Sequence, residues 1–177
     1  MSSIVDKIVA ISRALDDQRI AHAFGGALAL AWCTEQARGT IDIDVNIFLE
    51  PSSTTAVLAA LPPDIACTKE QQTALERDGQ VRMWWATTPV DVFMNTTEFH
   101  VQVAVRTRKH HFNGADIPFL SCTDLAVFKT FLNRTKDWAD IEAMIEMHTL
   151  DVDRVIGVLT RYLGPADKRV TRFLSLL

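Results

Sequence analysis

Two aspartates, Asp42 and Asp44, are separated by one residue within the apolar run 41–49. If this run is a strand, both side chains point to the same face of a sheet, because successive side chains alternate. Two carboxylates on one face repel each other unless a cation lies between them, and Mg²⁺ takes oxygen ligands of this kind. A solvated strand face is the alternative, but the apolar neighbours of both aspartates favour a metal site.

The dipeptide Gly25-Gly26 precedes this pair and is followed by an apolar segment, Ala27 to Thr34, that predicts a short helix. Glycine has no Cβ and accepts a positive φ, so the N–H groups of such a turn can approach phosphate oxygens. They would also lie at the positive end of the helix dipole. A tight turn without a ligand is the simpler interpretation of Gly25-Gly26 alone. Beside an aspartate pair, it indicates a site for a nucleotide and its metal.

Asp91 is a third candidate, because it stands among apolar residues in the segment 89–94, which predicts a short strand. An outward-facing acidic residue is the alternative. If this strand lies beside the strand that carries Asp42 and Asp44, the three carboxylates meet as catalytic residues and metal ligands. They would then hold one or two Mg²⁺ (or Mn²⁺) ions, which activate a hydroxyl and neutralise charge on the transferring phosphate.

A Gly-Gly turn, an Asp-x-Asp pair and a later acid together resemble the signature of DNA polymerase β-type minimal nucleotidyltransferases. The matching residues are Phe24-Gly25-Gly26, Asp42-x-Asp44 and Asp91. The lead-in Arg38-x-Thr40-x-Asp42 is common in small bacterial members of this superfamily, which implies that Thr40 belongs to the nucleotide site. The resemblance also implies an α/β (α+β) fold: a mixed-sheet nucleotidyltransferase core flanked by helices, with a C-terminal helical bundle.

A second block, residues 119–129 and 134–141, resembles the downstream region of the abortive-infection type nucleotidyltransferases, many of them toxins of toxin–antitoxin pairs. The resemblance implies that Lys129 contacts the triphosphate, where a mobile point charge suits phosphate oxygens. From its apolar neighbours alone, Lys129 is equally well explained as a lysine that covers the edge of the core. Arg134 and Lys136 would face phosphates, oriented by Asp137 or Asp140; a solvated start of a helix explains this charge run equally well.

The segment 106–111 is the most basic part of the chain. Arg106, Arg108 and Lys109 are candidates for contact with the backbone of an RNA acceptor, since phosphate contacts supply affinity with little sequence choice. An exposed strand end is the alternative for this segment.

The chain has 177 residues, a hydrophobic fraction of 48% and a net charge of −4. It can therefore bury a core, but it has no overall basic surface to capture long nucleic acid. Its three cysteines form no CxxC pair, so we expect reduced thiols and a cytoplasmic location. No apolar run is long enough to span a membrane. No P-loop, HExxH, GxSxG or GxGxxG motif is present.

Hydrophobic periodicity predicts early strands and late helices. We expect a nucleotidyltransferase core over residues 1–120 and a C-terminal helical region over 121–177, joined in one compact protein. The predicted strands are 20–24, 41–49, 81–86, 90–95, 101–105 and 116–120. The predicted helices are 4–15, 27–34, 51–61, 124–132, 137–148, 152–162 and 166–176. Residues 69–80 are polar and fit either a loop or an exposed helix.

These features favour a Mg²⁺-dependent nucleotidyltransferase, which converts an NTP and a hydroxyl acceptor into a nucleotidylated acceptor and pyrophosphate. The acceptor remains open between tRNA, a protein side chain and a small molecule such as an antibiotic. With tRNA, the resemblance implies a tRNA-modifying toxin and an antitoxin protein as partner. A non-catalytic nucleotide-binding regulator and a small metal-dependent nuclease are alternatives. Three convergent acids argue against the first, and the Gly-Gly turn with Lys129 argues against the second.

Overall fold

The structure is a computed structural model that describes residues 3–36 and 39–177. The chain divides into two compact units. We call residues 1–28 with 39–120 the α/β unit, and residues 29–38 with 121–177 the helical unit. Arg38, part of the lead-in to the aspartate pair, lies outside the described residues.

Among the described residues, the α/β unit is built on a seven-stranded sheet with the order β3-β4-β5-β2-β1-β7-β6. Strands β2 and β5 pair in parallel, as do β1 and β7, and the other neighbours are antiparallel. The strands are β1 (His22–Phe24), β2 (Ile43–Ile47), β3 (Ile65–Ala66), β4 (Gln80–Trp85), β5 (Thr88–Met94), β6 (Arg108–Phe112) and β7 (Ala115–Phe119).

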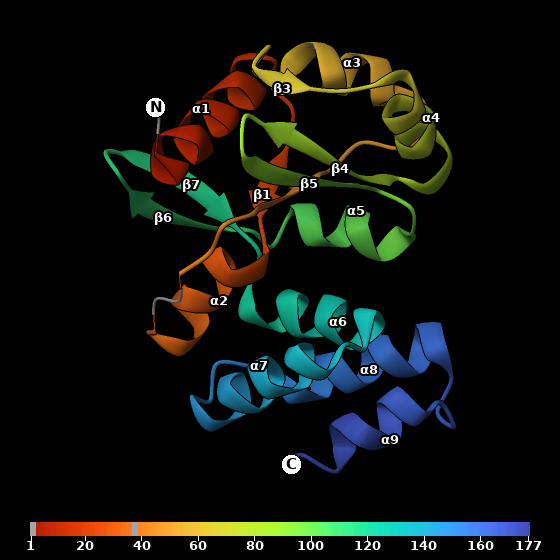
Figure 1. Cartoon of the computed structure of the whole chain (residues 1–177). Helices are drawn as coiled ribbons and strands as arrows, with labels where there is room; N and C mark the ends of the chain where they lie inside the picture. The colour runs from red at the N-terminus through yellow and green to blue at the C-terminus, as the bar shows by residue number, and fades with distance from the viewer. Residues whose placement is uncertain (1–2, 37–38) are drawn as a thin grey trace. The chain divides into compact units, whose positions relative to one another are not determined.

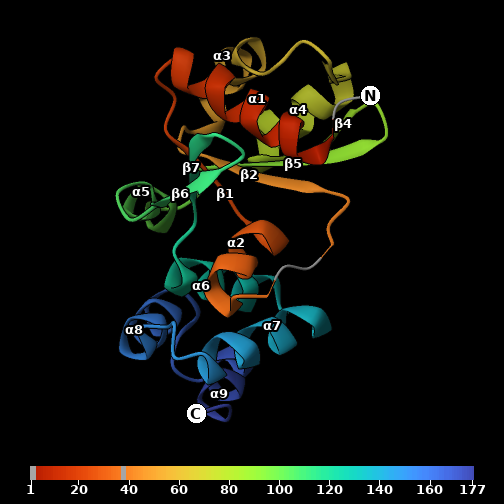
Figure 2. The ribbon, with the colours of Figure 1, turned by 90° about the vertical axis from the view of Figure 1, so that its left-hand side faces the viewer.

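The two faces of this sheet differ in polarity. Helices α1 (Ile4–Asp17), α3 (Thr54–Ala60) and α4 (Lys69–Asp78) cover one face, and α5 (Glu98–Ala104) lies on the other (Figures 1 and 2). Alternate residues of the central strands, such as Val45 and Val92, are fully buried. Because side chains alternate along a strand, Asp44 and Asp91 face the opposite side from these valines.

The predicted strand 101–105 is wrong, because this segment belongs to helix α5. Val101, Val103 and Val105 alternate with other residues and so imitate the period of a strand. In the helix, Phe99 and Val103 are four residues apart and fully buried, whereas Val101 and Val105 are exposed. Burial of Phe99 and Val103 on one side of the segment therefore favours a helix, although the valines alternate as they would in a strand.

The polar segment 69–80 forms helix α4 for most of its length. Thr68 caps the helix, since its hydroxyl accepts a hydrogen bond from the Gln71 N–H at 3.2 Å while the Gln71 side chain accepts one from the Thr68 N–H at 2.8 Å. Gly79 ends it in the left-handed region, at φ +67°. Strands β3 and β6 were not predicted.

The helical unit contains the end of α2 (Gly26–Thr34), which starts in the α/β unit, and a C-terminal set of helices. These are α6 (Cys122–Leu132), α7 (Thr135–Glu146), α8 (Val152–Leu163) and α9 (Lys168–Leu174), drawn in cyan to blue in Figure 1. Trp138, Leu159 and Phe173 are buried in its core. The predicted fold class, a mixed sheet with flanking helices and a helical C-terminal region, is confirmed.

The expectation of reduced thiols is wrong for two of the three cysteines. Cys33 of α2 and Cys122 of α6 form a disulfide, and their Cα atoms are 5.5 Å apart although 89 residues separate them in sequence. Cys67 is free. The sequence spacing of the pair carries no signal, because the packing of two helices within the helical unit brings the thiols together.

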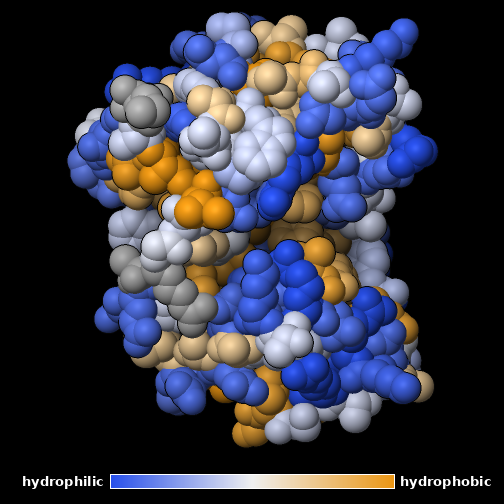
Figure 3. All heavy atoms as spheres, viewed as in Figure 1, coloured by the Kyte–Doolittle hydropathy of each residue, from blue (hydrophilic) through white to orange (hydrophobic). Residues whose placement is uncertain are grey.

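The surface in Figure 3 is mostly hydrophilic, with hydrophobic side chains exposed in small groups. In the described part of the chain, no helix combines the length and the apolar character needed to cross a membrane.

Candidate active site

Two of the predicted acids face each other across neighbouring strands. The parallel register of β2 and β5 places Asp44 opposite Asp91, and both lie on the polar face of the sheet. Asp42 lies one residue before β2, and the Thr40 hydroxyl donates a hydrogen bond to its Oδ1 at 2.8 Å. The structure therefore gathers the three predicted carboxylates at one end of β2, and Thr40 orients Asp42.

The Gly-Gly turn lies directly against this group. The Gly25 N–H donates to the Asp44 carbonyl at 2.9 Å, so this donor is already used by the sheet. Gly26 begins helix α2 at φ +53°, and a Cβ there would lie 2.7 Å from the Asp44 Cγ. Only glycine fits this position, both for its backbone conformation and for its closeness to the carboxylate. The phosphate-binding prediction therefore depends on Gly26 and the residues after it.

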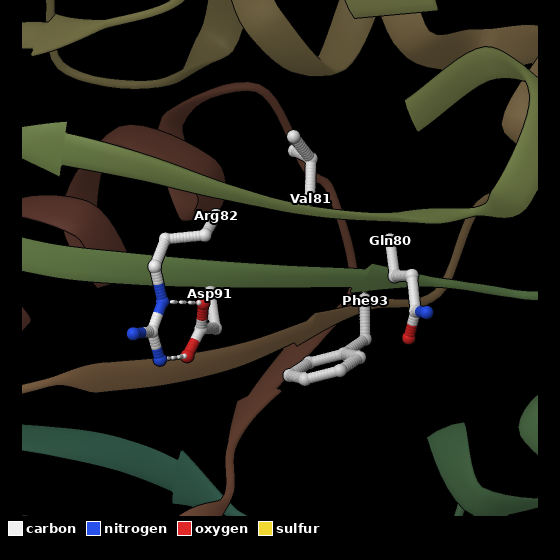
Figure 4. Close-up of a pocket in the computed structure, with 5 residues that line it drawn as sticks. All are labelled: Gln80, Val81, Arg82, Asp91 and Phe93. Atoms are coloured by element: carbon white, nitrogen blue, oxygen red, sulfur yellow. Dashed lines mark hydrogen bonds and ion pairs between the residues drawn. The ribbon is translucent and has the colours of Figure 1, made fainter. Parts of the chain in front are cut away.

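Arg82 is part of the site and was not predicted. Its Nε and Nη2 donate to the two Asp91 carboxylate oxygens at 2.7 and 2.6 Å (Figure 4). Nη2 also lies 3.6 Å from Asp42 Oδ2. The hydrogen bonds that Arg82 donates to Asp91, together with the negative charge of Asp91, raise the pKa of Arg82 above its usual range. A signal was present in the sequence: a two-residue turn between β4 and β5 pairs Arg82 with Asp91.

A pocket of about 280 Å³ opens beside this ion pair. It is lined by Gln80, Val81, Arg82, Asp91 and Phe93, and Figure 4 shows the Phe93 ring between the Arg82–Asp91 pair and the Gln80 amide. The pocket therefore offers an aromatic face, an amide and a guanidinium to a ligand near Asp91.

The three predicted carboxylates differ in how well they suit a divalent metal. In the part of the chain that the structure describes, no three His, Cys, Asp or Glu side chains are grouped so that they could hold a metal ion. Asp91 has both oxygens engaged by Arg82. Mg²⁺ at nucleotide sites needs only one or two carboxylates, since substrate phosphates and waters complete its shell. Asp42 and Asp44 fit that requirement.

The predicted phosphate contacts of the second block lie in the helical unit, and Lys129 is buried there. Its Nζ lies 2.7 Å from Asp140 Oδ2 and 3.4 Å from Asp137 Oδ1. Arg134 also binds Asp137, with Nε 2.7 Å from Oδ2. Burial acts to raise the pKa of Asp137, but hydrogen bonds from Arg134 and the charge of Lys129 lower it overall. Lys136 is exposed on the first turn of α7.

The predicted RNA-contacting residues lie on strand β6 and just before it. Arg106 precedes β6, and its guanidinium lies 5.8 Å from the centre of the Phe99 ring. Arg108 and Lys109 are exposed neighbours on β6, an edge strand, so their side chains point to opposite faces. His111 of the same strand lies 3.2 Å from Asp116.

No known family model matches this sequence, and no curated protein matches it. Solved structures of nucleotidyltransferases do share its fold. The crystal structure of ANT(2'')-Ia in complex with adenylyl-2''-tobramycin matches with a TM-score of 0.61 and 12% identity, covering 98% of both chains. The solution structure of this antibiotic-resistance factor matches with a TM-score of 0.61 and 12% identity, covering 89% of this chain and 92% of that chain.

An antigenic nucleotidyltransferase-like protein from Paracoccidioides brasiliensis matches with a TM-score of 0.57 and 16% identity, over 99% of this chain and 88% of that chain. The fold of this protein is therefore that of nucleotidyltransferases.

Proposed function

We propose that this protein is a Mg²⁺-dependent nucleotidyltransferase that moves a nucleoside monophosphate from an NTP to a hydroxyl. The observation that carries this proposal is the register of β2 and β5. It sets Asp44 opposite Asp91, with the Gly26 turn against Asp44. Like charges on neighbouring strands repel each other, so two aligned acids beside a turn restricted to glycine favour a site that binds a cation.

Each residue of the site has its own role in the proposed reaction. Asp42 and Asp44 would hold Mg²⁺, which neutralises charge on the reacting phosphate when it is bound. The start of α2 at Gly26 orients phosphate oxygens through its N–H groups. Asp91 would accept the proton of the attacking hydroxyl after Arg82 releases its oxygens. Thr40 keeps Asp42 in its orientation through the hydrogen bond to Oδ1.

We propose a small molecule as the acceptor. The ANT(2'')-Ia complex contains an adenylylated small molecule. The fold of ANT(2'')-Ia matches that of this protein over 98% of each chain. The pocket beside Asp91, of about 280 Å³, is slightly smaller than the roughly 300–1,000 Å³ of whole small-molecule sites, so it would hold part of a small acceptor. A tRNA acceptor is less well supported, because Arg108 and Lys109 point to opposite faces of strand β6.

The test is transfer from each α-³²P-labelled NTP in the presence of Mg²⁺. Acceptors are supplied separately: a panel of aminoglycosides and other hydroxyl-rich small molecules, total tRNA, and the protein alone. We expect label on a small molecule, lost in Asp42→Asn and Asp44→Asn. Asp116→Asn is the matched control, because Asp116 is exposed on β7 and pairs only with a surface histidine in the contacts described above.

Label on tRNA alone would overturn the acceptor proposal and leave the nucleotidyltransferase activity intact. Wild-type rates in both Asp42→Asn and Asp44→Asn would overturn the proposed activity of this site. Normal melting curves of these variants separate loss of transfer from loss of folding.

A further inference from the structure

The Arg82–Asp91 pair differs from an ordinary surface ion pair in its accessibility. The Asp91 side chain is 15% exposed, whereas that of Arg82 is 52% exposed. Arg77 and Asp78 form a pair with the same two hydrogen-bond distances on α4, but both of their side chains are more exposed, at 72% and 40%. The Arg82 guanidinium therefore shields the carboxylate that it binds.

Both oxygens of Asp91 are engaged by Arg82 at the same time, through Nε on one and Nη2 on the other. A metal ion bound to either oxygen at about 2.1 Å would have to approach a guanidinium that is already in contact with the carboxylate. The two cations repel each other, and the arginine cannot relieve this repulsion by losing a proton. Metal binding at Asp91 therefore requires that the guanidinium moves away.

We propose that Arg82 competes with the divalent metal for Asp91, so that without a nucleotide the metal binds only to Asp42 and Asp44. Arg82 acts on the site by positioning Asp91 and keeping it out of the metal shell. This inference rests on the proposed function, because it takes Asp42 and Asp44 as the metal ligands beside Asp91. Arg82 Nη2 lies 3.6 Å from Asp42 Oδ2, so the guanidinium is within reach of a second carboxylate when it leaves Asp91.

The experiment measures Mn²⁺ affinity by electron paramagnetic resonance on the full chain without nucleotide, so that no activity is needed. Removing the guanidinium in Arg82→Gln should tighten Mn²⁺ binding by roughly tenfold, the scale of one charge-assisted hydrogen-bonded pair. Arg82→Lys retains the charge but cannot bind both oxygens of Asp91 as the guanidinium does. Its Mn²⁺ affinity should therefore lie between those of the wild type and Arg82→Gln. Arg77→Gln removes the same charge from a similar pair elsewhere and should leave Mn²⁺ affinity unchanged.

A double-mutant cycle with Asp91→Asn separates competition from a simple loss of positive charge. If Arg82 acts through Asp91, Arg82→Gln should have little effect in the Asp91→Asn background. An equal gain in both backgrounds would overturn the inference, because it would show a general charge effect.

Unchanged Mn²⁺ affinity in both Arg82→Gln and Arg82→Lys would also overturn the inference. If Arg82→Gln does not fold, the same comparison is made with Arg82→Lys, in the wild-type chain and in the Asp91→Asn variant. Failure of the proposed function has a different signature: Mn²⁺ affinity that is insensitive to both Asp42→Asn and Asp44→Asn, together with no labelled acceptor.

Discussion

The Asp44 carboxylate lies directly against Gly26, so a Cβ at position 26 would lie 2.7 Å from the Asp44 Cγ. Gly26 also has a φ of +53°, which costs an L-residue about 1 kcal/mol or more. Gly26→Ala should therefore displace Asp44 or the start of α2, and weaken NTP binding at least tenfold, about 1.4 kcal/mol. Isothermal titration calorimetry with an NTP and Mg²⁺ measures this change. Gly157→Ala is the control, since a Cβ there meets no atom within 4 Å. Wild-type NTP affinity in Gly26→Ala would contradict the phosphate-binding role of the turn.

Replacement of Lys129 by methionine should destabilise the protein strongly. The change leaves Asp140 and Asp137 buried without the ammonium that lies between them. Breaking a buried ion pair by removing one partner costs about 3–5 kcal/mol. Chemical denaturation of Lys129→Met measures the loss in the free energy of unfolding, and Lys136→Met on the exposed start of α7 is the control. Unchanged stability with a selective loss of NTP over NMP affinity would instead support the triphosphate contact implied by the sequence.

The stability of the α/β unit should fall as the pH drops below 6.5. Burial lowers the pKa of His100 to about 4, from the usual 6.5. Burial also lowers the pKa of His22, although the hydrogen bond with the Ile20 carbonyl opposes this shift. Between the usual pKa of 6.5 and the lowered pKa of His100, the histidines of the unfolded chain bind protons that those of the folded chain do not. The free energy of unfolding is therefore constant above pH 6.5 and decreases below it.

Urea denaturation at a series of pH values tests this dependence, and the double variant His22→Gln/His100→Gln should flatten it. His148→Asn, on an exposed histidine, should keep the wild-type dependence. A profile that is flat between pH 6.5 and 4 in the wild-type chain would contradict the assignment.

Reduction of the Cys33–Cys122 disulfide should lower the melting temperature. The crosslink closes a long loop, with a sequence separation of 89 residues, and such crosslinks typically contribute about 2–4 kcal/mol. Differential scanning calorimetry with and without dithiothreitol measures the change. Cys33→Ser should melt like the reduced protein and should not respond to the reductant, whereas Cys67→Ser should respond as the wild type does. Free thiols at both Cys33 and Cys122 under oxidising conditions would contradict the crosslink.

The local part of the site could be predicted from the sequence. Alternation along a strand places side chains two residues apart on one face, which links Asp42 with Asp44. Two glycines before an apolar segment predict a turn that leads into a helix. These inferences depend on conformational preferences of a few consecutive residues, and the structure places those residues together. Helices α6 to α9 were predicted for the same reason, since their apolar residues recur at the helical period.

Relationships between distant segments could not be predicted in this way. The segment 101–105 has the alternation of a strand, but burial of Phe99 and Val103 on one side selected a helix. Cys33 and Cys122 meet only because two helices pack together.

By itself the sequence determined the residue types of the site, the turn at Gly26 and the helical C-terminal region, because these depend on local periodicity and on the backbone freedom of glycine. The tertiary structure alone decided that Asp91 lies opposite Asp44. The physical reason is that strand pairing and register are set by the burial of a whole sheet face. A shift of one residue would turn every side chain of a strand to the other face.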